Sequence, residues 1–331
     1  MAIKTFTQPA CPFCGIEGNI IHHSLKDRLF GVPGRWAVRR CVDPACDLAW
    51  LDPMPLEAEV VKLYKNYYTH KKTTPFKKPH LMHSMGRLSL KMGYSIIKRM
   101  FSLKEKRRRL KYMFLEPGRD GKKLLEVGCG NGARLRAFKD KGWQVTGQEL
   151  DPQAATYAKT EFDVNVLLGD LIDIGLEGEQ FDAIVMNHVI EHICEPVGML
   201  AECNRILKPG GKVVITTPNI ESYGHAVFGE NWRGLEPPRH LHLFSKQSAV
   251  PLMHKSGFRQ YKIWTSAARA ASMAHGSIDL SLFGSHTMGE RPRQMVFLRE
   301  IIFQYKALQN WSQHQNSGEE LIIKAEKTPW Q

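Results

Sequence analysis

The sequence has 331 residues, of which 43% are hydrophobic, and its 27 glycines and 18 prolines are ordinary numbers for this length. This composition excludes disordered, collagen-like and low-complexity proteins, and the length allows two or three domains. There are 46 Lys and Arg against 33 Asp and Glu, so the formal net charge is +13. The whole excess lies in residues 1–120, which favours phosphates, anionic lipids or acidic partners for that region.

No apolar run reaches the roughly 18 residues that a membrane span requires, and the first residues lack the apolar core of a signal peptide. We therefore expect a cytoplasmic protein. Composition and motifs divide the chain into three segments, 1–55, 56–120 and 121–331.

Residues 1–55 contain two close cysteine pairs, Cys11 with Cys14 and Cys41 with Cys46. Two such pairs, separated by a strand-loop-strand length, are typical of a tetrahedral Zn²⁺ site with four thiolate ligands. A disulfide is not expected in a cytosolic chain, and a redox motif needs no second pair. The segment is therefore predicted to be a small zinc-binding module whose metal is structural.

Residues 56–120 are expected to be mostly helical, because apolar residues recur at helical spacing over residues 56–68 and again over 82–114. A loop is expected between these helices, over residues 71–79. The second helix is basic and amphipathic, so peripheral contact with a membrane surface is one interpretation of it. The other is a helix that covers the next domain and keeps its lysines in water.

From residue 121 onward, apolar strands alternate with helical stretches, which predicts an α/β fold with a parallel sheet covered on both faces. Strands are expected over residues 124–127, 145–147, 164–168, 183–186 and 213–217. After them we expect a helix over 245–257, a strand over 259–264, a helical insertion over 285–315 and a closing strand over 320–327.

The first of these strands ends in a glycine-rich turn that contains Glu126, Gly128, Gly130 and Gly132. Glycines at this spacing let the backbone turn tightly and approach a bound molecule closely. An acid directly before such a turn would repel a pyrophosphate. It suits a ligand with a positive charge, such as an ammonium or a sulfonium.

Two further carboxylates follow at the ends of the next two strands. Glu149 stands where a doubly wound sheet meets ribose hydroxyls, and Asp170 is placed to receive an adenine amino group. Glu149 could instead be a surface acid or a helix N-cap. The three features in order, at consecutive strand ends, indicate a nucleoside ligand.

With these motifs, residues 122–217 resemble the class I S-adenosylmethionine-dependent methyltransferases. The turn before the fifth strand, residues 207–212, also matches that family. The resemblance implies a Rossmann-like seven-stranded sheet whose last strand is antiparallel. It also implies that the glycine loop and Asn187 lie near the methionine part of the cofactor, Glu149 near the ribose and Asp170 near the adenine.

The order of cysteine pairs, tyrosine-rich helix, methyltransferase and the segment 238–245 is similar to a bacterial group that includes deoxysugar C-methyltransferases. That resemblance implies that His240 is the base and that His192 is a second active-site histidine. It also implies a substrate contact at Tyr67 or Tyr68. Arg239 replaces the acid found before the base in that group, and Pro237 stands where the group has a tyrosine.

Removal of a proton from the acceptor suits a histidine, whose ordinary pKa is near 6.5. His188, His192, His240 and His242 are candidates, and we favour His240 as base with His192 as an orienting or substrate contact. Glu191 is assigned to the same site, either on a substrate hydroxyl or as a residue that orients the helix. Arg239 suits an anionic group on the acceptor, or forms a surface salt bridge.

The insertion over residues 218–244 is interpreted as a substrate cover with Trp232 among its contacts, although Trp232 could also be a packed structural residue. The leading hypothesis is a methyltransferase for a small hydroxylated acceptor: a sugar nucleotide, a glycan or a secondary-metabolite intermediate, methylated on carbon or oxygen. One alternative is an O-methyltransferase for a quinone or lipid-like acceptor at a membrane surface. The other is a non-catalytic nucleic-acid-binding protein with a vestigial methyltransferase fold, which the intact cofactor motifs disfavour.

Overall fold

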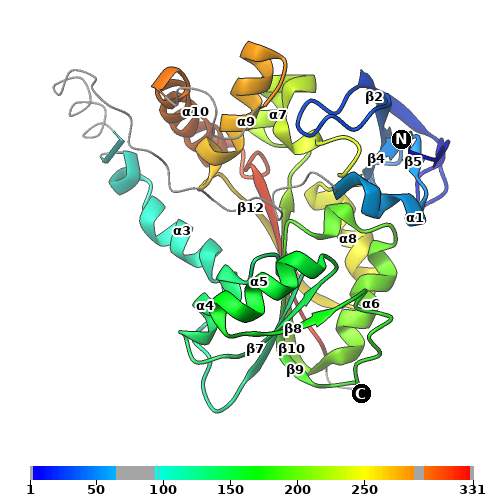
Figure 1. Cartoon of the computed structure of the whole chain (residues 1–331). Coiled ribbons are helices and arrows are strands. Elements are labelled where there is room, and N and C mark those ends of the chain that lie inside the picture. Colours follow the sequence, from blue (N-terminus) through cyan, green and yellow to red (C-terminus); the bar gives the residue numbers. More distant parts are fainter. Residues whose placement is uncertain (1–2, 65–93, 96, 287–293, 329–331) are drawn as a thin grey trace.

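The computed structural model describes residues 3–64, 94–95, 97–286 and 294–328. At its centre lies a seven-stranded sheet in the order β12-β13-β10-β9-β6-β7-β8 (Figure 1). Its strands are β6 (Lys123–Val127), β7 (Gln144–Glu149), β8 (Asn165–Leu168), β9 (Phe181–Asn187), β10 (Leu207–Pro218), β12 (Gln260–Ser266) and β13 (Glu320–Glu326). Strands β6 to β10 pair in parallel, whereas β13 runs antiparallel to both of its neighbours. The predicted Rossmann-like sheet with an antiparallel last strand is confirmed.

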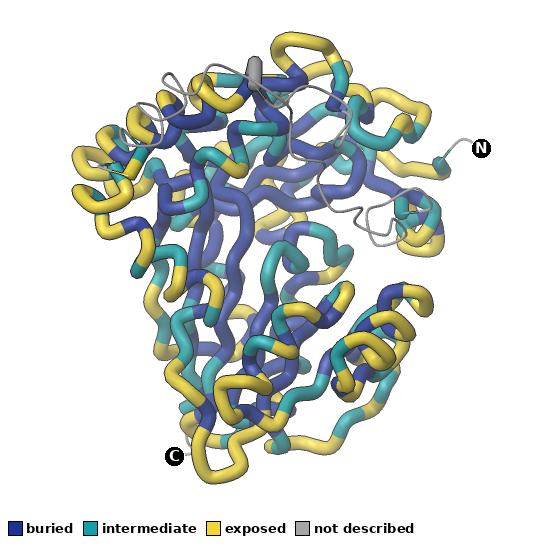
Figure 2. The backbone as a smooth tube through the Cα atoms, turned by 60° about the vertical axis from the view of Figure 1, so that its left-hand side comes forward, coloured by how far each residue is buried: buried dark blue, intermediate teal, exposed yellow. Residues whose placement is uncertain are grey.

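Helices cover both faces of this sheet: α4 (Ala133–Lys139), α5 (Pro152–Phe162), α6 (Pro196–Ile206) and α8 (Lys246–Lys255). Successive strand residues point to opposite faces, so neighbours in one strand fill different cores. Leu125 and Ile215 pack with α6 and α8, whereas Leu124 and Val214 pack with α4 and α5. The central strands are therefore buried on both sides (Figure 2).

A helical layer lies beyond one end of the sheet, at the top of Figure 1. It consists of α7 (Tyr223–Phe228), the short 3-10 turns η4 (Gly229–Asn231) and η5 (Arg233–Leu235), α9 (Ala270–Phe283) and α10 (Gln294–Gln313). Helix α10 lies within the predicted insertion over 285–315, but α9 was not predicted. Its sequence has small and apolar residues on all sides, which is typical of a buried helix and gives no amphipathic pattern.

The N-terminal segment forms a second sheet from β2 (Gly18–Leu25), β3 (Trp36–Cys41) and β4 (Ala49–Asp52). A two-stranded pair lies beside it, formed by β1 (Thr5–Phe6) and β5 (Met54–Pro55). The edge of the second sheet is completed by β11 (His242–Leu243), which pairs with β4 so that His242 lies opposite Trp50. The 218–244 insertion therefore reaches the N-terminal module and adds a strand to it.

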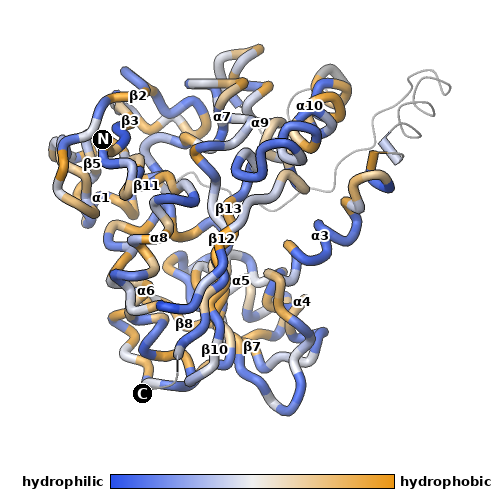
Figure 3. Tube along the Cα trace, turned by 180° about the vertical axis from the view of Figure 1, so that it is seen from behind, coloured by the Kyte–Doolittle hydropathy of each residue, from blue (hydrophilic) through white to orange (hydrophobic). Residues whose placement is uncertain are grey.

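In the region 56–120 the structure describes the helices α1 (Glu57–Val60), η1 (Val61–Tyr64) and α3 (Leu103–Lys111), whereas residues 115–119 are not helical. The helix predicted over 82–114 is interrupted at Ser102, which has a φ of 50°, and residues 65–93, including the loop expected over 71–79, lie outside the described part. Helix α3 is strongly hydrophilic (Figure 3), yet it buries Leu103 and Leu110 in the core beside Leu124. Within the described ranges, every helix is too short or too polar to cross a membrane.

A buried ion pair joins the N-terminal module to the 218–244 insertion. The Arg239 guanidinium donates to both carboxylate oxygens of Asp27, at 2.8 Å each, and its Nε donates to Glu236 at 3.0 Å. Both partners are fully removed from water. Burial on its own would raise the pKa of Asp27, but Arg239 and backbone N–H groups lower it below its usual range.

We expect Asp27→Asn to lower the free energy of unfolding by about 3–5 kcal/mol, because it leaves a buried guanidinium without its main counter-charge. Urea denaturation followed by tryptophan fluorescence measures this change. Asp163→Asn is the matched control, because Asp163 is 95% exposed and its ion pair with Lys139 lies in water. Equal denaturation midpoints for the two variants would contradict the assigned role of the Arg239–Asp27 pair.

Candidate active site

The glycine-rich turn after β6 is shaped by three residues with positive φ, Gly128, Gly130 and Gly132, at 63°, 54° and 78°. A Cβ at Gly128 would come within 2.6 Å of Val189, and a Cβ at Gly132 would come equally close to Ala158. A Cβ at Gly130 would enter open space. Two glycines therefore allow close packing, and the third leaves room for a molecule that lies against the backbone.

Two side chains at the end of β7 hold this turn. Glu149 accepts a hydrogen bond from the Gly130 N–H at 2.7 Å through one oxygen, and its other oxygen accepts from the N–H groups of Leu150 and Asp151. Gln148 accepts from the Gly128 N–H at 3.1 Å and donates to the Gly169 carbonyl at 2.6 Å. Sequence analysis missed Gln148, since a glutamine in a strand carries no motif signal.

Glu126 is buried beneath the turn and keeps one oxygen, Oε2, without a hydrogen-bond partner among the described residues. Its other oxygen lies 3.1 Å from Nε of Arg134. Burial raises the pKa of Glu126 to about 8 although Arg134 opposes the shift. A buried carboxylate with an unpaired oxygen beside open backbone space fits a cationic ligand.

The other predicted cofactor residues lie at the next strand ends of the same sheet edge. Asp170 follows β8 and accepts from the Ile172 N–H at 2.9 Å, and Asn187 ends β9 and accepts from the Thr216 hydroxyl at 2.8 Å. Both side chains are only partly buried. The carboxyl ends of four parallel strands therefore bring the predicted cofactor residues to one edge, where open α/β sheets bind ligands.

A second part of the site is a cavity of about 340 Å³ between the ends of β10 and β13 and helix α9. Its lining includes the histidines His188, His192, His240, His275 and His286 and the charged residues Arg233, Glu236, Arg269 and Glu320. The two predicted active-site histidines thus face one common space. Sequence analysis did not single out Glu236, Arg269 or Glu320, because they come from separate parts of the chain.

His240 and His192 lie with their ring centroids 4.7 Å apart. His240 Nδ1 donates to the Gly234 carbonyl at 2.7 Å, and His192 Nδ1 donates to the Arg239 carbonyl at 3.0 Å. A carbonyl oxygen can only accept, so each ring carries its proton on Nδ1 and leaves Nε2 as an acceptor. Burial, and next the neighbouring His192, lower the pKa of His240 to about 4, so His240 is uncharged at neutral pH.

His242, the alternate candidate, is buried against Phe13 and Phe244 and does not line the cavity. His240 precedes β11, so the two histidines do not belong to one strand and their side chains lie in different surroundings.

Glu191 lies behind the cavity wall. It is fully buried, accepts from the Thr217 hydroxyl at 3.0 Å and faces His188 at 3.3 Å. Burial alone would lower the pKa of His188, but Glu191 and Glu320 raise it to about 9, so His188 is a cation at neutral pH. Glu191 is therefore placed to hold and charge His188, and it does not line the acceptor cavity.

Of the four predicted substrate residues, the structure describes only Arg239 and Trp232, and neither lines the cavity. Tyr67 and Tyr68 lie outside the described residues, but the Tyr64 hydroxyl lies 3.0 Å from His192 Nδ1. Arg239 is fully buried in its ion pair with Asp27 and does not reach the cavity, so the expected anion contact is wrong. Trp232 is 1% exposed and packs in a small core with Leu243, so the structural alternative holds for it.

The four N-terminal cysteines converge as their spacing predicts. The sulfur atoms of Cys11 and Cys46 lie 3.6 Å apart, those of Cys14 and Cys41 lie 3.4 Å apart, and all four fall within 4.8 Å of one another. Tetrahedral thiolates at the usual Zn–S distance are separated by about 3.8 Å. The donor set and its spacing fit one zinc ion.

Comparison with known proteins identifies the central part of the chain. Residues 97–263, about half of the sequence, match the family described as "Methyltransferase domain". A ubiquinone biosynthesis O-methyltransferase of Cereibacter sphaeroides is 31% identical over 134 residues, which cover 38% of this chain and 54% of that protein. The enzyme of the same name from Coxiella burnetii is 29% identical over 131 residues, covering 38% and 56%. The chain thus spans about half the length of these curated relatives.

Solved structures with a similar course of the chain include a SAM-dependent methyltransferase from Archaeoglobus fulgidus, with a TM-score of 0.45 and 19% identity over 71% of this chain and 99% of that one. Another is phosphoethanolamine N-methyltransferase 2 of Haemonchus contortus in complex with S-adenosyl-L-methionine, with a TM-score of 0.44 and 20% identity over 64% and 50%. The family match, the strand order and the glycine turn agree with one another, and the chain belongs to the S-adenosylmethionine-dependent methyltransferases.

Proposed function

We propose that the protein transfers a methyl group from S-adenosylmethionine to an oxygen of a small hydroxylated acceptor, with His240 as the general base. The observation that carries this proposal is the pair formed by His240 and His192, which present Nε2 acceptors to a cavity at the carboxyl ends of the strands. Both rings are oriented by backbone carbonyls, so their geometry is fixed before the acceptor binds.

The proposed cofactor fits the residues at the sheet edge. Gly130 leaves open space, and Glu126 offers an unpaired buried oxygen to a positive charge. When bound, S-adenosylmethionine supplies an electrophilic methyl group whose transfer leaves a neutral thioether. The chain's own residues hold the two reactants in line, and His240 receives the proton that the acceptor oxygen loses.

The acceptor is proposed to be polar, as in a sugar nucleotide, a glycan or a secondary-metabolite intermediate. The cavity wall supports this choice, because it carries histidines and the guanidinium groups of Arg233 and Arg269. Arg233 is paired with Glu236, and Arg269 lies 3.5 Å from Glu320. These two arginines and the cationic His188, and not Arg239, bring positive charge to the cavity wall, and each of them also faces a carboxylate.

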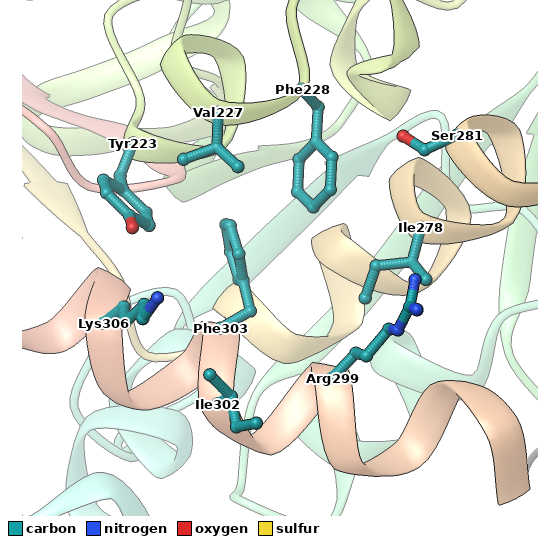
Figure 4. A pocket seen from close by; sticks show the side chains of 9 residues that line it. All are labelled: Tyr223, Val227, Phe228, Ile278, Ser281, Arg299, Ile302, Phe303 and Lys306. Atoms are coloured by element: carbon teal, nitrogen blue, oxygen red, sulfur yellow. The ribbon is translucent and has the colours of Figure 1, made fainter.

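A second candidate is a quinone or lipid-like acceptor, which the printed name of the curated relatives favours. A separate hollow of about 230 Å³ between α7, α9 and α10 supports it (Figure 4). Phe228 and Phe303 face each other there with ring centroids 5.2 Å apart, and Arg299 and Lys306 stand on α10 beside them. An apolar groove with basic residues beside it suits an acyl or prenyl tail next to anionic head groups.

For the N-terminal module we propose one structural Zn²⁺ held by Cys11, Cys14, Cys41 and Cys46. Four thiolates close the coordination shell, and no position remains for a substrate. The ion would fix the loops that carry β3 and β4, and β4 pairs with the strand that follows His240. Metal in this module would therefore stabilise the acceptor side of the site from a distance.

We expect His240→Gln to reduce turnover by about 100-fold or more, because the acceptor loses its base, while affinity for S-adenosylhomocysteine stays unchanged. Turnover is measured as the transfer of tritiated methyl groups to two sets of acceptors, nucleotide sugars and prenylated phenols. Labelling of the prenylated phenols alone would favour the quinone-like acceptor. His254→Gln, a surface histidine paired with Tyr261, is the control. An unchanged rate in the His240 variant would assign the base elsewhere.

Cofactor affinity should rise with pH. A cation binds the ionised form of Glu126, and the ionised fraction of a carboxyl with a pKa near 8 grows about 20-fold between about pH 6.5 and about pH 8.5. Calorimetry with S-adenosylmethionine, which carries the sulfonium charge, should follow this increase in the wild type and find a flat profile in Glu126→Gln, with the exposed Glu161→Gln behaving as wild type. Absence of any cofactor binding, together with salt-sensitive binding of oligonucleotides, would instead support the non-catalytic alternative.

Cys14→Ser should release the zinc ion and lower the melting temperature, while affinity for S-adenosylhomocysteine is retained, because the cofactor residues lie on the other sheet. Metal analysis by mass spectrometry and thermal unfolding measure the two effects. Cys194→Ser, outside the cluster, should keep the metal. If metal analysis finds no zinc in the purified wild-type protein, the metal assignment is wrong.

A further inference from the structure

A second group of metal-ligating side chains lies in the wall of the acceptor cavity, away from the cysteines. Helix α9 places His275 and Asp279 one turn apart, on the same face. His286 joins them from the segment after the helix, where its backbone N–H donates to the Arg28 carbonyl at 3.1 Å. The three side chains each offer a ligand atom, and these atoms lie within 4.8 Å of one another.

Asp279 provides the independent sign that something is bound here. It is 2% exposed, and its Oδ2 accepts from His286 Nδ1 at 2.8 Å. Its other oxygen, Oδ1, is buried and has no hydrogen-bond partner among the described residues. A buried carboxylate oxygen without a partner costs free energy unless a cation or a hydrogen-bond donor binds to it.

The surroundings of His275 resemble those of a metal ligand. Its Nδ1 donates to the Glu300 carboxylate at 2.5 Å, and Glu300 belongs to the neighbouring helix α10. A carboxylate that fixes one ring nitrogen of a histidine leaves the other nitrogen as a more basic ligand, and this arrangement recurs around protein-bound metals. Two histidines and one carboxylate suit zinc, iron(II), cobalt(II) or manganese(II).

We propose that His275, Asp279 and His286 bind one divalent transition-metal ion in the wall of the acceptor cavity. His275 and His286 both line that cavity. Three protein ligands leave at least one coordination position open, as in sites that bind an exchangeable oxygen ligand. The ion would accept a hydroxyl, carboxylate or phosphate oxygen of the molecule in the cavity. This last role rests on the proposed function, whereas the metal site itself does not.

One neighbouring cluster, formed by Glu191, His192 and His240, has a similar spacing of ligand atoms. Each carboxylate keeps one buried oxygen without a hydrogen-bond partner among the described residues, Oε1 of Glu191 and Oδ1 of Asp279. The Glu191 oxygen lies 3.3 Å from His188 Nδ1, which forms an ion pair with it, whereas no salt bridge is found at Oδ1 of Asp279 among the described residues. The experiment therefore has to distinguish the two clusters.

The test is a titration of tag-free, zinc-containing full-length protein with Co²⁺, without cofactor or acceptor. We expect one equivalent to bind with visible d–d absorption and without the charge-transfer band that thiolate ligands produce. His275→Gln and Asp279→Asn should each weaken binding by about 10-fold or more, and Glu300→Gln, which keeps all three ligands, by about 10-fold. His254→Gln and His240→Gln should bind as the wild type does.

Three results would overturn the proposal: cobalt bound only with a thiolate band, unchanged affinity in His275→Gln, or loss of the cobalt in His240→Gln. The variants are expected to fold, because His275 is partly exposed and Asp279→Asn preserves shape; thermal unfolding checks this. Since the titration contains neither cofactor nor acceptor, its failure would leave the proposed methyl transfer untouched, and failure of methyl transfer would not affect the titration.

Discussion

The position of His240 depends on the buried ion pair between Arg239 and Asp27. The guanidinium is bound at both ends, by Asp27 from the N-terminal module and by Glu236 from the same loop, so the backbone at residues 239 and 240 has little freedom. Two backbone carbonyls of this loop, those of Gly234 and Arg239, then set the tautomers of the two histidines. Because charges that are shielded from solvent interact strongly, the Arg239–Asp27 ion pair holds the acceptor side of the site in place.

A line of alternating acidic and basic side chains runs from the glycine turn to the cavity. Glu126 pairs with Arg134, Arg134 interacts with Glu320, and Glu320 faces His188, which in turn faces Glu191. All these groups are half-buried or buried, so each one sets the charge state of the next. The cofactor edge and the acceptor cavity thus belong to one electrostatic unit although they are built from different strands.

The sequence predicted those parts of the molecule whose signal is local. The glycine turn, the acids at consecutive strand ends and the two cysteine pairs each lie within a few residues, and the structure brings them together as expected. Arg239 could not be assigned, because its partner Asp27 is 212 residues away and burial leaves no local trace. Helix α9 was missed for a related reason: its small, apolar and polar residues are mixed around the whole circumference, so its sequence shows no clear period of 3.6. The tyrosine contact of His192 came from Tyr64, a few residues before the pair that the resemblance implied.

The pairing of β11 with β4 has a consequence for how proteins of this kind can diversify. The curated relatives match 38% of this chain. In this chain, β11, which follows His240 in the same loop, pairs with β4 and so joins the N-terminal sheet through backbone hydrogen bonds. Recombination that exchanged one of these pieces without the other would separate a strand from its partner. The N-terminal module and the loop that bears His240 therefore depend on each other: without the other piece, β4 would lose the strand at its edge and Arg239 would lose Asp27.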